Sequence, residues 1–258
     1  MHRLVLRALW IIGLLLLCVP LHYLSLLFGR SPWPRRFLGW VGRAAGMRVR
    51  VEGQPLLRDV LFLANHLSWL DIVLVAGASG AAFVSKDEVG RWPVIGWLAR
   101  LNRTVFIART ARGAVRSQAD ALRVALASGQ PVALFPEGTT DGGPAILPFR
   151  ASLLASLFPP LPGLKVQPIA IDYGPAAHDI AWVGEESAGA NVKRILSRRG
   201  TCPVMVRFLE PIDPTAAGDR KSLAEAARAE IVATLGGAAS AAPAAGHPRP
   251  SGRASDRL

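Results

Sequence analysis

The chain has 258 residues, of which 51% are hydrophobic, and it carries a formal net charge of +12. Nucleic-acid-binding modules with basic stripes are seldom so apolar, so we expect an anionic membrane surface as the partner and no nucleic acid. The two cysteines, Cys18 and Cys202, are too few for a disulfide framework or a cysteine-based metal site, and we expect free thiols.

The N-terminal segment, residues 1–45, is predicted to anchor the chain to a membrane. Residues 4–28 are almost wholly apolar, which is enough to cross about 30 Å of hydrocarbon as a helix. Either the segment spans the bilayer, or it bends near Pro20, enters one leaflet and returns. A cleaved signal peptide is disfavoured because no small residues mark a cleavage site. The heavier basic flank, which includes Arg35 and Arg36, follows the apolar stretch and predicts an inner-membrane protein whose catalytic domain is cytoplasmic.

Residues 46–235 are predicted to form one α/β domain, and the Ala-, Gly-, Pro- and Ser-rich residues 236–258 a disordered tail. Strand-like runs alternate with helical patterns, which is typical of a mostly parallel mixed central sheet flanked by helices. The expected strands are 48–52, 60–64, 81–85, 104–108, 131–134, 166–171 and 203–209. The expected helices are 91–100, 111–126, 190–196 and 223–235, with two others, one after residue 71 and one that begins near residue 148.

Polar residues interrupt the apolar pattern directly after the predicted strand 60–64. The heptad NHLSWLD, residues 65–71, contains His66 and Asp71. A histidine at the carboxyl end of a strand lies where ligand sites gather and can act as a base near neutral pH. If His66 is in the loop and Asp71 in the first helical turn, the carboxylate can orient one ring nitrogen and leave the other free to take a proton. A helix-capping aspartate beside a partly buried histidine is the alternative.

A second motif, FPEGTT at residues 135–140, follows the predicted strand 131–134. Asn65-His66 with Asp71, followed in this order by residues 135–139, resembles the 1-acylglycerol-3-phosphate acyltransferase (lysophospholipid acyltransferase) family. These membrane enzymes of phospholipid biosynthesis move an acyl chain from a thioester donor to a lysolipid hydroxyl. The resemblance covers residues 49–209 and implies the glycerolipid acyltransferase fold.

The resemblance also assigns roles to residues. It implies that His66 is the general base and that Asp71 steadies the resulting imidazolium. It further implies that the acceptor is bound by Arg109, Glu137, Gly138 and Thr139.

Glu137 is expected to accept hydrogen bonds from a glycerol-like hydroxyl. Arg109 ends the segment 106–109, which matches a family motif whose arginine faces the substrate phosphate, and Arg150 matches a basic position of the family. Residues 166–171 match a strand thought to line the acyl-donor side.

The acceptor and the donor stay open at this level. A guanidinium binds phosphate and carboxylate alike, so the acceptor is 1-acylglycerol-3-phosphate or, alternatively, lyso-ornithine lipid or another lysolipid. The donor is acyl-CoA or acyl carrier protein, and no other cofactor is expected. No metal is implied, because the five histidines show no ligand spacing.

Backbone amides after His66 are expected to serve as oxyanion donors. Two rival functions remain, a serine lipid hydrolase that uses Ser68 and a non-catalytic membrane-binding module.

Overall fold

The structure, a computed structural model, describes residues 2–29, 31–107 and 114–236, with the backbone alone at residues 86, 107 and 114–120. In this part of the chain a 7-stranded sheet has the order β1-β7-β6-β2-β5-β3-β4. The strands are β1 (Met47–Glu52), β2 (Val60–Ala64), β3 (Ala82–Lys86), β4 (Val105–Ile107), β5 (Val132–Leu134), β6 (Lys165–Asp172) and β7 (Cys202–Phe208).

Neighbouring strands run parallel, except that β6 and β7 are antiparallel. The mostly parallel mixed sheet predicted from the sequence is therefore confirmed. Because β5 and β6 both pair with β2, one on each side, and both run parallel to it, the loops that follow the three strands leave the same edge of the sheet. This edge brings residues 65–71, residues 135–140 and the segment after Asp172 together.

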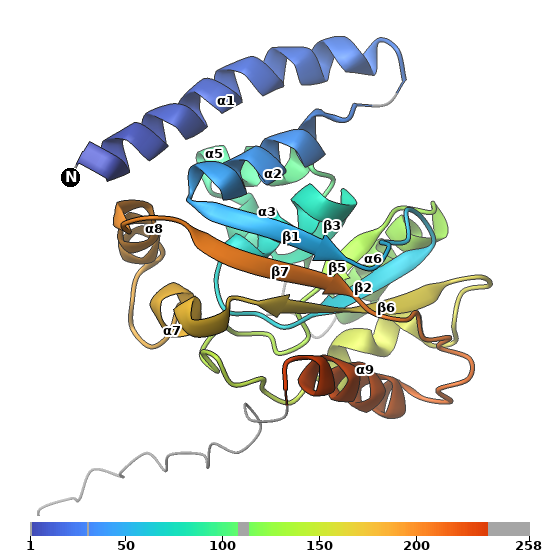
Figure 1. Cartoon of the computed structure of the whole chain (residues 1–258). Helices are drawn as coiled ribbons and strands as arrows, with labels where there is room; N and C mark the ends of the chain where they lie inside the picture. Colours follow the sequence, from blue (N-terminus) through green and yellow to red (C-terminus); the bar gives the residue numbers. More distant parts are fainter. Residues whose placement is uncertain (1, 30, 108–113, 237–258) are drawn as a thin grey trace, which may run out of the picture.

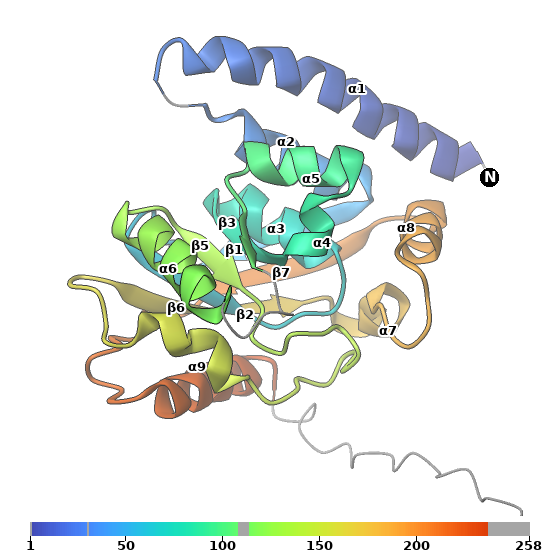
Figure 2. The ribbon, with the colours of Figure 1, turned by 180° about the vertical axis from the view of Figure 1, so that it is seen from behind.

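Helices cover both faces of the sheet (Figures 1 and 2). The helices α2 (Trp33–Ala44), α3 (Leu70–Ser79) and α5 (Pro93–Leu101) lie on one side, below α1 (His2–Leu26), and α6 (Ala114–Ala127) and α9 (Arg220–Thr234) lie on the other. The remaining helical segments are α4 (Asp87–Gly90), α7 (Ala177–Ile180), α8 (Ala188–Ser197) and the 3₁₀ turns η1 (Ala151–Leu157) and η2 (Gly174–Ala176). The helix expected to begin near residue 148 is thus the 3₁₀ turn η1, which begins at Ala151.

The strand that precedes the His66 loop is buried on both faces. Val60, Phe62 and Ala64 pack with α2 and α3, whereas Leu61 and Leu63 pack with α6 and α9. Successive side chains of a strand point to opposite faces, so a strand between two helical layers needs apolar residues at every position. This double burial fixes the position from which the loop leaves the sheet.

The apolar N-terminal segment forms one continuous helix, α1, with Pro20 inside it. Of the two alternatives drawn from the sequence, the turn near Pro20 is not the one observed, because the chain turns back only after Leu26, into α2. The Arg7 guanidinium donates to the carbonyl of Gly200 at 2.9 Å and to carbonyls at the end of α8. Near the other end of α1, Trp33 donates its indole N–H to Ser25 at 2.8 Å. Both ends of α1 are therefore tied to the rest of the chain.

Candidate active site

Asp71 lies in the first turn of α3 and reaches back to the loop that precedes it. His66 Nδ1 and Asp71 Oδ2 are 2.9 Å apart, and the same oxygen accepts the amides of Leu67 at 2.6 Å and Ser68 at 2.9 Å. The contact between His66 and Asp71 that the spacing predicts is confirmed. With the carboxylate accepting from Nδ1, the lone pair of the neutral imidazole is on Nε2, the atom that can take a proton.

The amides after His66 are engaged by Asp71. Because Leu67 and Ser68 both donate to Oδ2, the expectation that they serve as oxyanion donors is wrong. Ser68 is also fully buried, and its hydroxyl oxygen accepts the Leu70 amide at 3.1 Å. A side chain without access to substrate cannot act as the nucleophile of a serine hydrolase.

The loop is anchored to the neighbouring strand by Asn65. Its side-chain amide donates to the Ile171 carbonyl at 3.0 Å, and its side-chain oxygen accepts the Ile171 amide at 2.8 Å. These two side-chain bonds join the start of the loop to the backbone of β6, beyond the last β2–β6 pair, Ala64 with Ile169. They place His66 at the sheet edge with little freedom.

Glu137 holds backbone atoms from two segments. Its Oε1 accepts the His66 amide at 2.8 Å and its Oε2 accepts the Leu147 amide at 2.9 Å, and the residue is only 2% exposed. In the structure Glu137 therefore holds two backbone amides, and its contact with an acceptor hydroxyl stays a prediction.

The environment of Glu137 also changes its acidity. The pKa of Glu137 is raised to about 7, because burial and the charge of Asp71, which raise it, outweigh the hydrogen bonds from Leu147 and His66, which lower it. Through its bond to the His66 amide, the Glu137 carboxyl group connects the motif at residues 135–140 to the motif at residues 65–71.

Aromatic rings pack against the imidazole. The ring of Phe135 stacks on His66 with centroids 4.0 Å apart and an interplanar angle of 12°. The ring of Phe83 also stacks with Phe135, with ring centroids 5.8 Å apart. The His66 side chain is 17% exposed, so one ring face is covered while part of the ring stays accessible.

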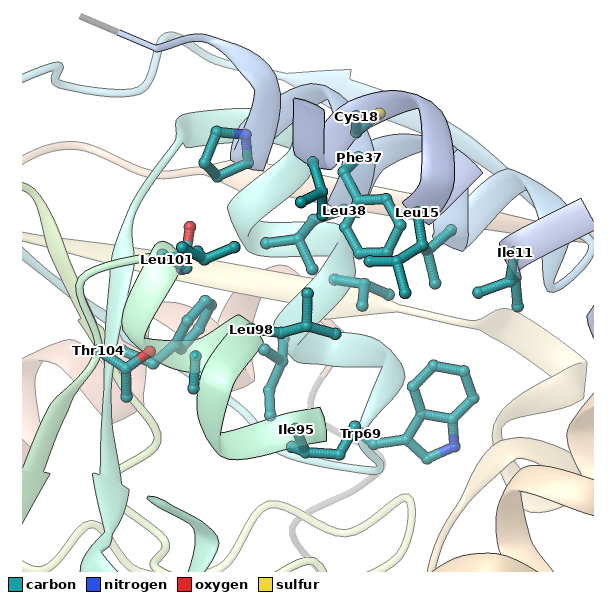
Figure 3. Close-up of a pocket in the computed structure, with 18 of the residues that line it drawn as sticks. Ile11, Leu15, Cys18, Phe37, Leu38, Trp69, Ile95, Leu98, Leu101 and Thr104 are labelled. Carbon is teal, nitrogen blue, oxygen red and sulfur yellow. The ribbon is translucent and has the colours of Figure 1, made fainter. Parts of the chain in front are cut away.

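Phe83 also lines an apolar cavity of about 490 Å³. The cavity lies between α1, α2, α3 and α5, and Figure 3 shows Leu15, Phe37 and Leu98 around it. Trp69, three positions after His66 in the chain, is part of the same wall. An apolar space thus begins beside the aromatic stack that carries the imidazole.

The remaining predicted binding residues lie in the turn after β5. Gly138 has φ of +73°, and a Cβ atom there would be 3.3 Å from Arg150 Nε. Thr139 Oγ1 donates to Asp141 Oδ2 at 2.8 Å. The exposed Arg150 therefore places its guanidinium against Gly138, while Arg109 lies outside the described residues.

Tyr173 is a residue of this site that the sequence analysis missed. It follows β6, is 2% exposed, and its hydroxyl donates to Asp71 Oδ1 at 2.6 Å. Its position directly after a predicted parallel strand was the available signal. No cluster of three or more His, Cys, Asp and Glu side chains that could hold a metal ion occurs among the described residues.

The sequence is similar to that of known proteins. Residues 48–172 match the Acyltransferase family. Lyso-ornithine lipid O-acyltransferase from Brucella abortus is 35% identical over 248 residues, which are 87% of this chain and 90% of that protein. 1-acyl-sn-glycerol-3-phosphate acyltransferase from Neisseria gonorrhoeae is 39% identical over 136 residues, 51% of this chain and 52% of that protein.

A solved structure also resembles the chain. The 1-acyl-sn-glycerophosphate (LPA) acyltransferase PlsC from Thermotoga maritima superimposes with a TM-score of 0.60 at 25% identity, over 78% of this chain and 76% of that one.

Proposed function

This chain belongs to the acyltransferase family, and from that premise we propose that it moves an acyl chain from a thioester to the free hydroxyl of a lysolipid, with His66 as the general base. Its relatives are lysophospholipid acyltransferases. The observation that carries the proposal is the 2.9 Å bond between His66 Nδ1 and the buried Asp71, because it leaves Nε2 as the proton acceptor.

The reaction needs no acyl-enzyme. Nε2 of His66 takes the proton of the acceptor hydroxyl while that oxygen attacks the thioester carbonyl. Asp71 stabilises the imidazolium that forms. The tetrahedral intermediate collapses, the carbon–sulfur bond breaks, and the imidazolium returns its proton to the leaving thiolate. The products are an ester and a free thiol, and the thioester, acyl-CoA or acyl carrier protein, is the co-substrate with no further cofactor.

Lyso-ornithine lipid is the acceptor that we favour. The relatives that this chain matches over most of both lengths carry that name, whereas the match to the Neisseria enzyme covers about half of each chain. This reverses the order of preference drawn from the motifs alone. Arg150 beside Gly138 supports binding of a carboxylate or phosphate there, since its guanidinium can bind the carboxylate of the ornithine headgroup as it would a phosphate. 1-Acylglycerol-3-phosphate is the second candidate.

The apolar cavity supports binding of an acyl chain next to the base. Its volume of about 490 Å³ falls within the roughly 300–1,000 Å³ typical of ligand pockets. Its lining is almost entirely hydrophobic, so it favours hydrocarbon over any polar part of a substrate.

The membrane placement rests on α1, the one helix among the described residues that is long and apolar enough to span a bilayer. The side of α1 turned away from the domain exposes large apolar residues, including Leu16 at 71% and Trp10 at 63%. Because both ends of α1 are tied to the domain, we favour insertion along one leaflet over a crossing. Together with the basic residues that follow the apolar stretch, this supports placing the active site at the cytoplasmic surface of the inner membrane.

The test uses membranes that contain the full chain, labelled acyl-CoA or acyl carrier protein, and a panel of lysolipids that includes lyso-ornithine lipid and 1-acylglycerol-3-phosphate. Wild type is expected to acylate lyso-ornithine lipid fastest, and His66→Ala to abolish transfer. His2→Ala, which alters an exposed histidine at the start of α1, is the matched control and should keep full activity. A correctly folded wild type that acylates none of these lipids would instead fit a non-catalytic membrane-binding module.

A further inference from the structure

The two oxygens of Asp71 are held in different ways. Oδ2 accepts from His66 Nδ1 and from the amides of Leu67 and Ser68. Oδ1 accepts from the hydroxyl of Tyr173 at 2.6 Å. A carboxylate held through one oxygen can pivot about that oxygen, and a bond to the other oxygen fixes the plane of the group.

That plane determines how Oδ2 meets the imidazole. Hydrogen bonds prefer to lie near the plane of the carboxylate, so a carboxylate that tilts out of line weakens its bond to Nδ1. Asp71 is fully buried. Without the Tyr173 hydroxyl, Asp71 Oδ1 would lack this hydrogen-bond donor in the protein interior, where an unpaired polar atom costs free energy of folding.

The phenol is suited to act as a permanent donor. Burial and the charge of Asp71 raise the pKa of Tyr173 well above its usual range, so the hydroxyl keeps its proton across the pH range in which the enzyme works. Tyr173 directly follows β6, the strand beside β2, and lies 102 positions after Asp71 in the chain. Its backbone is fixed by β6 on one side and by the η2 turn on the other.

We propose that Tyr173 is a positioning residue of the transfer reaction, which acts through Asp71 by fixing the plane of the carboxylate that orients His66. The inference rests on the proposed function, because it concerns how the general base of that reaction is held. Tyr173 itself is placed away from substrate, since it is buried behind Asp71.

The first test is Tyr173→Phe, which removes the hydroxyl and keeps the ring. We expect kcat to fall about ten- to 150-fold, the range that loss of a hydrogen bond to a charged group allows, while KM for donor and acceptor stays within about twofold. An unchanged kcat in a folded Tyr173→Phe protein would overturn the proposal.

Two controls separate positioning from loss of stability. Ile231→Val removes one methylene from the core on the other face of the sheet. It should lower the melting temperature modestly, as we expect for Tyr173→Phe, but it changes no residue of the site. Tyr23→Phe makes the same chemical change at the other tyrosine of the chain, which is 49% exposed on α1. Both should keep the wild-type kcat. A loss of kcat in Ile231→Val equal to that in Tyr173→Phe would mean that Tyr173 is merely structural.

A double substitution tests whether Tyr173 acts through Asp71. In the Asp71→Asn background the orienting charge is gone, so adding Tyr173→Phe should lower the residual rate by less than about twofold. A further loss as large as in the wild-type background would show independent action and refute the proposal. If wild type itself transfers no acyl chain, the proposed function fails; if wild type is active and equals Tyr173→Phe, only this inference fails.

Discussion

Glu137 Oε1 accepts the backbone amide of His66 at 2.8 Å. This bond connects the loop after β5 to the loop after β2, so the second sequence motif holds the first in place. The carboxylate acts on the backbone of the base, whereas Asp71 acts on its ring. The two acidic residues of the site thus position the same histidine, Glu137 through its backbone amide and Asp71 through its ring.

Asp71→Asn should lower kcat by about 10²- to 10⁴-fold with the fold intact, a range set by the loss of the orienting carboxylate in a comparable triad. The side-chain oxygen of the new amide can still accept from His66, and its NH₂ group can donate to Tyr173, so packing survives while the charge that stabilises the imidazolium is lost. Initial rates in membranes measure the effect. Asp179→Asn, at an exposed ion pair with Arg198, should leave the rate near wild type; a similar loss in both variants would count against a catalytic role for Asp71.

Glu137→Gln should change how stability depends on pH. The pKa of Glu137 is raised from 4.5 to about 7 in the folded chain, so the folded state binds the proton more tightly than the unfolded state. The contribution of this group is therefore fully present below pH about 4.5 and is lost as pH rises towards about 7. The stability of wild type relative to Glu137→Gln should fall by up to about 3 kcal/mol over that interval.

Denaturant midpoints of both proteins in detergent, measured at pH 5 and pH 8, give this difference. A difference that is the same at both pH values would contradict the assigned cause, which is burial of the carboxyl group.

Gly138→Ala should impair acceptor binding by displacing Arg150. The left-handed backbone at φ of +73° costs an alanine about 1 kcal/mol, and the new Cβ would meet the guanidinium at 3.3 Å. We expect the acceptor KM to rise about three- to tenfold, equivalent to about 1 kcal/mol of lost headgroup binding.

Gly163→Ala is the matched control for this change. Gly163 has φ of +76° and nothing within 4 Å of the position of its Cβ, so it carries the same backbone cost without the steric contact. It should lose similar stability and keep the wild-type acceptor KM. Equal acceptor KM values for Gly138→Ala and Gly163→Ala would show that Arg150 does not bind the acceptor.

Filling the apolar cavity should change the preference for acyl chain length. Leu98 lines the cavity from α5 (Figure 3), and Leu98→Trp adds bulk there. We expect kcat/KM to fall about tenfold or more for long-chain donors and less than about twofold for short-chain donors, because only the longer hydrocarbon needs the space. Val124→Trp, at a 69% exposed position on α6, should leave the chain-length profile unchanged. Equal losses for all donors would place the acyl chain elsewhere.

The sequence by itself determined the strand that ends at Ala64, the turn that follows it, and the contact between His66 and Asp71. These features are local: a strand buried on both faces must be apolar throughout, and a loop followed at once by a helix brings residues five positions apart together. The mostly parallel sheet followed in the same way from the alternation of strand and helix patterns.

Only the tertiary structure decided which side chains support that pair. Tyr173 and Glu137 reach the site because β6 and β5 lie on either side of β2, and this strand order is set by packing across the whole domain. The sequence marked Glu137 through its motif, but it did not show that Glu137 and Tyr173 bond to the His66 loop and to Asp71. The same holds for α1, whose attachment to α8 through Arg7 joins residues 188 positions apart in the chain. Local periodicity fixes each element, whereas the contacts between loops at one sheet edge exist only once the elements are assembled.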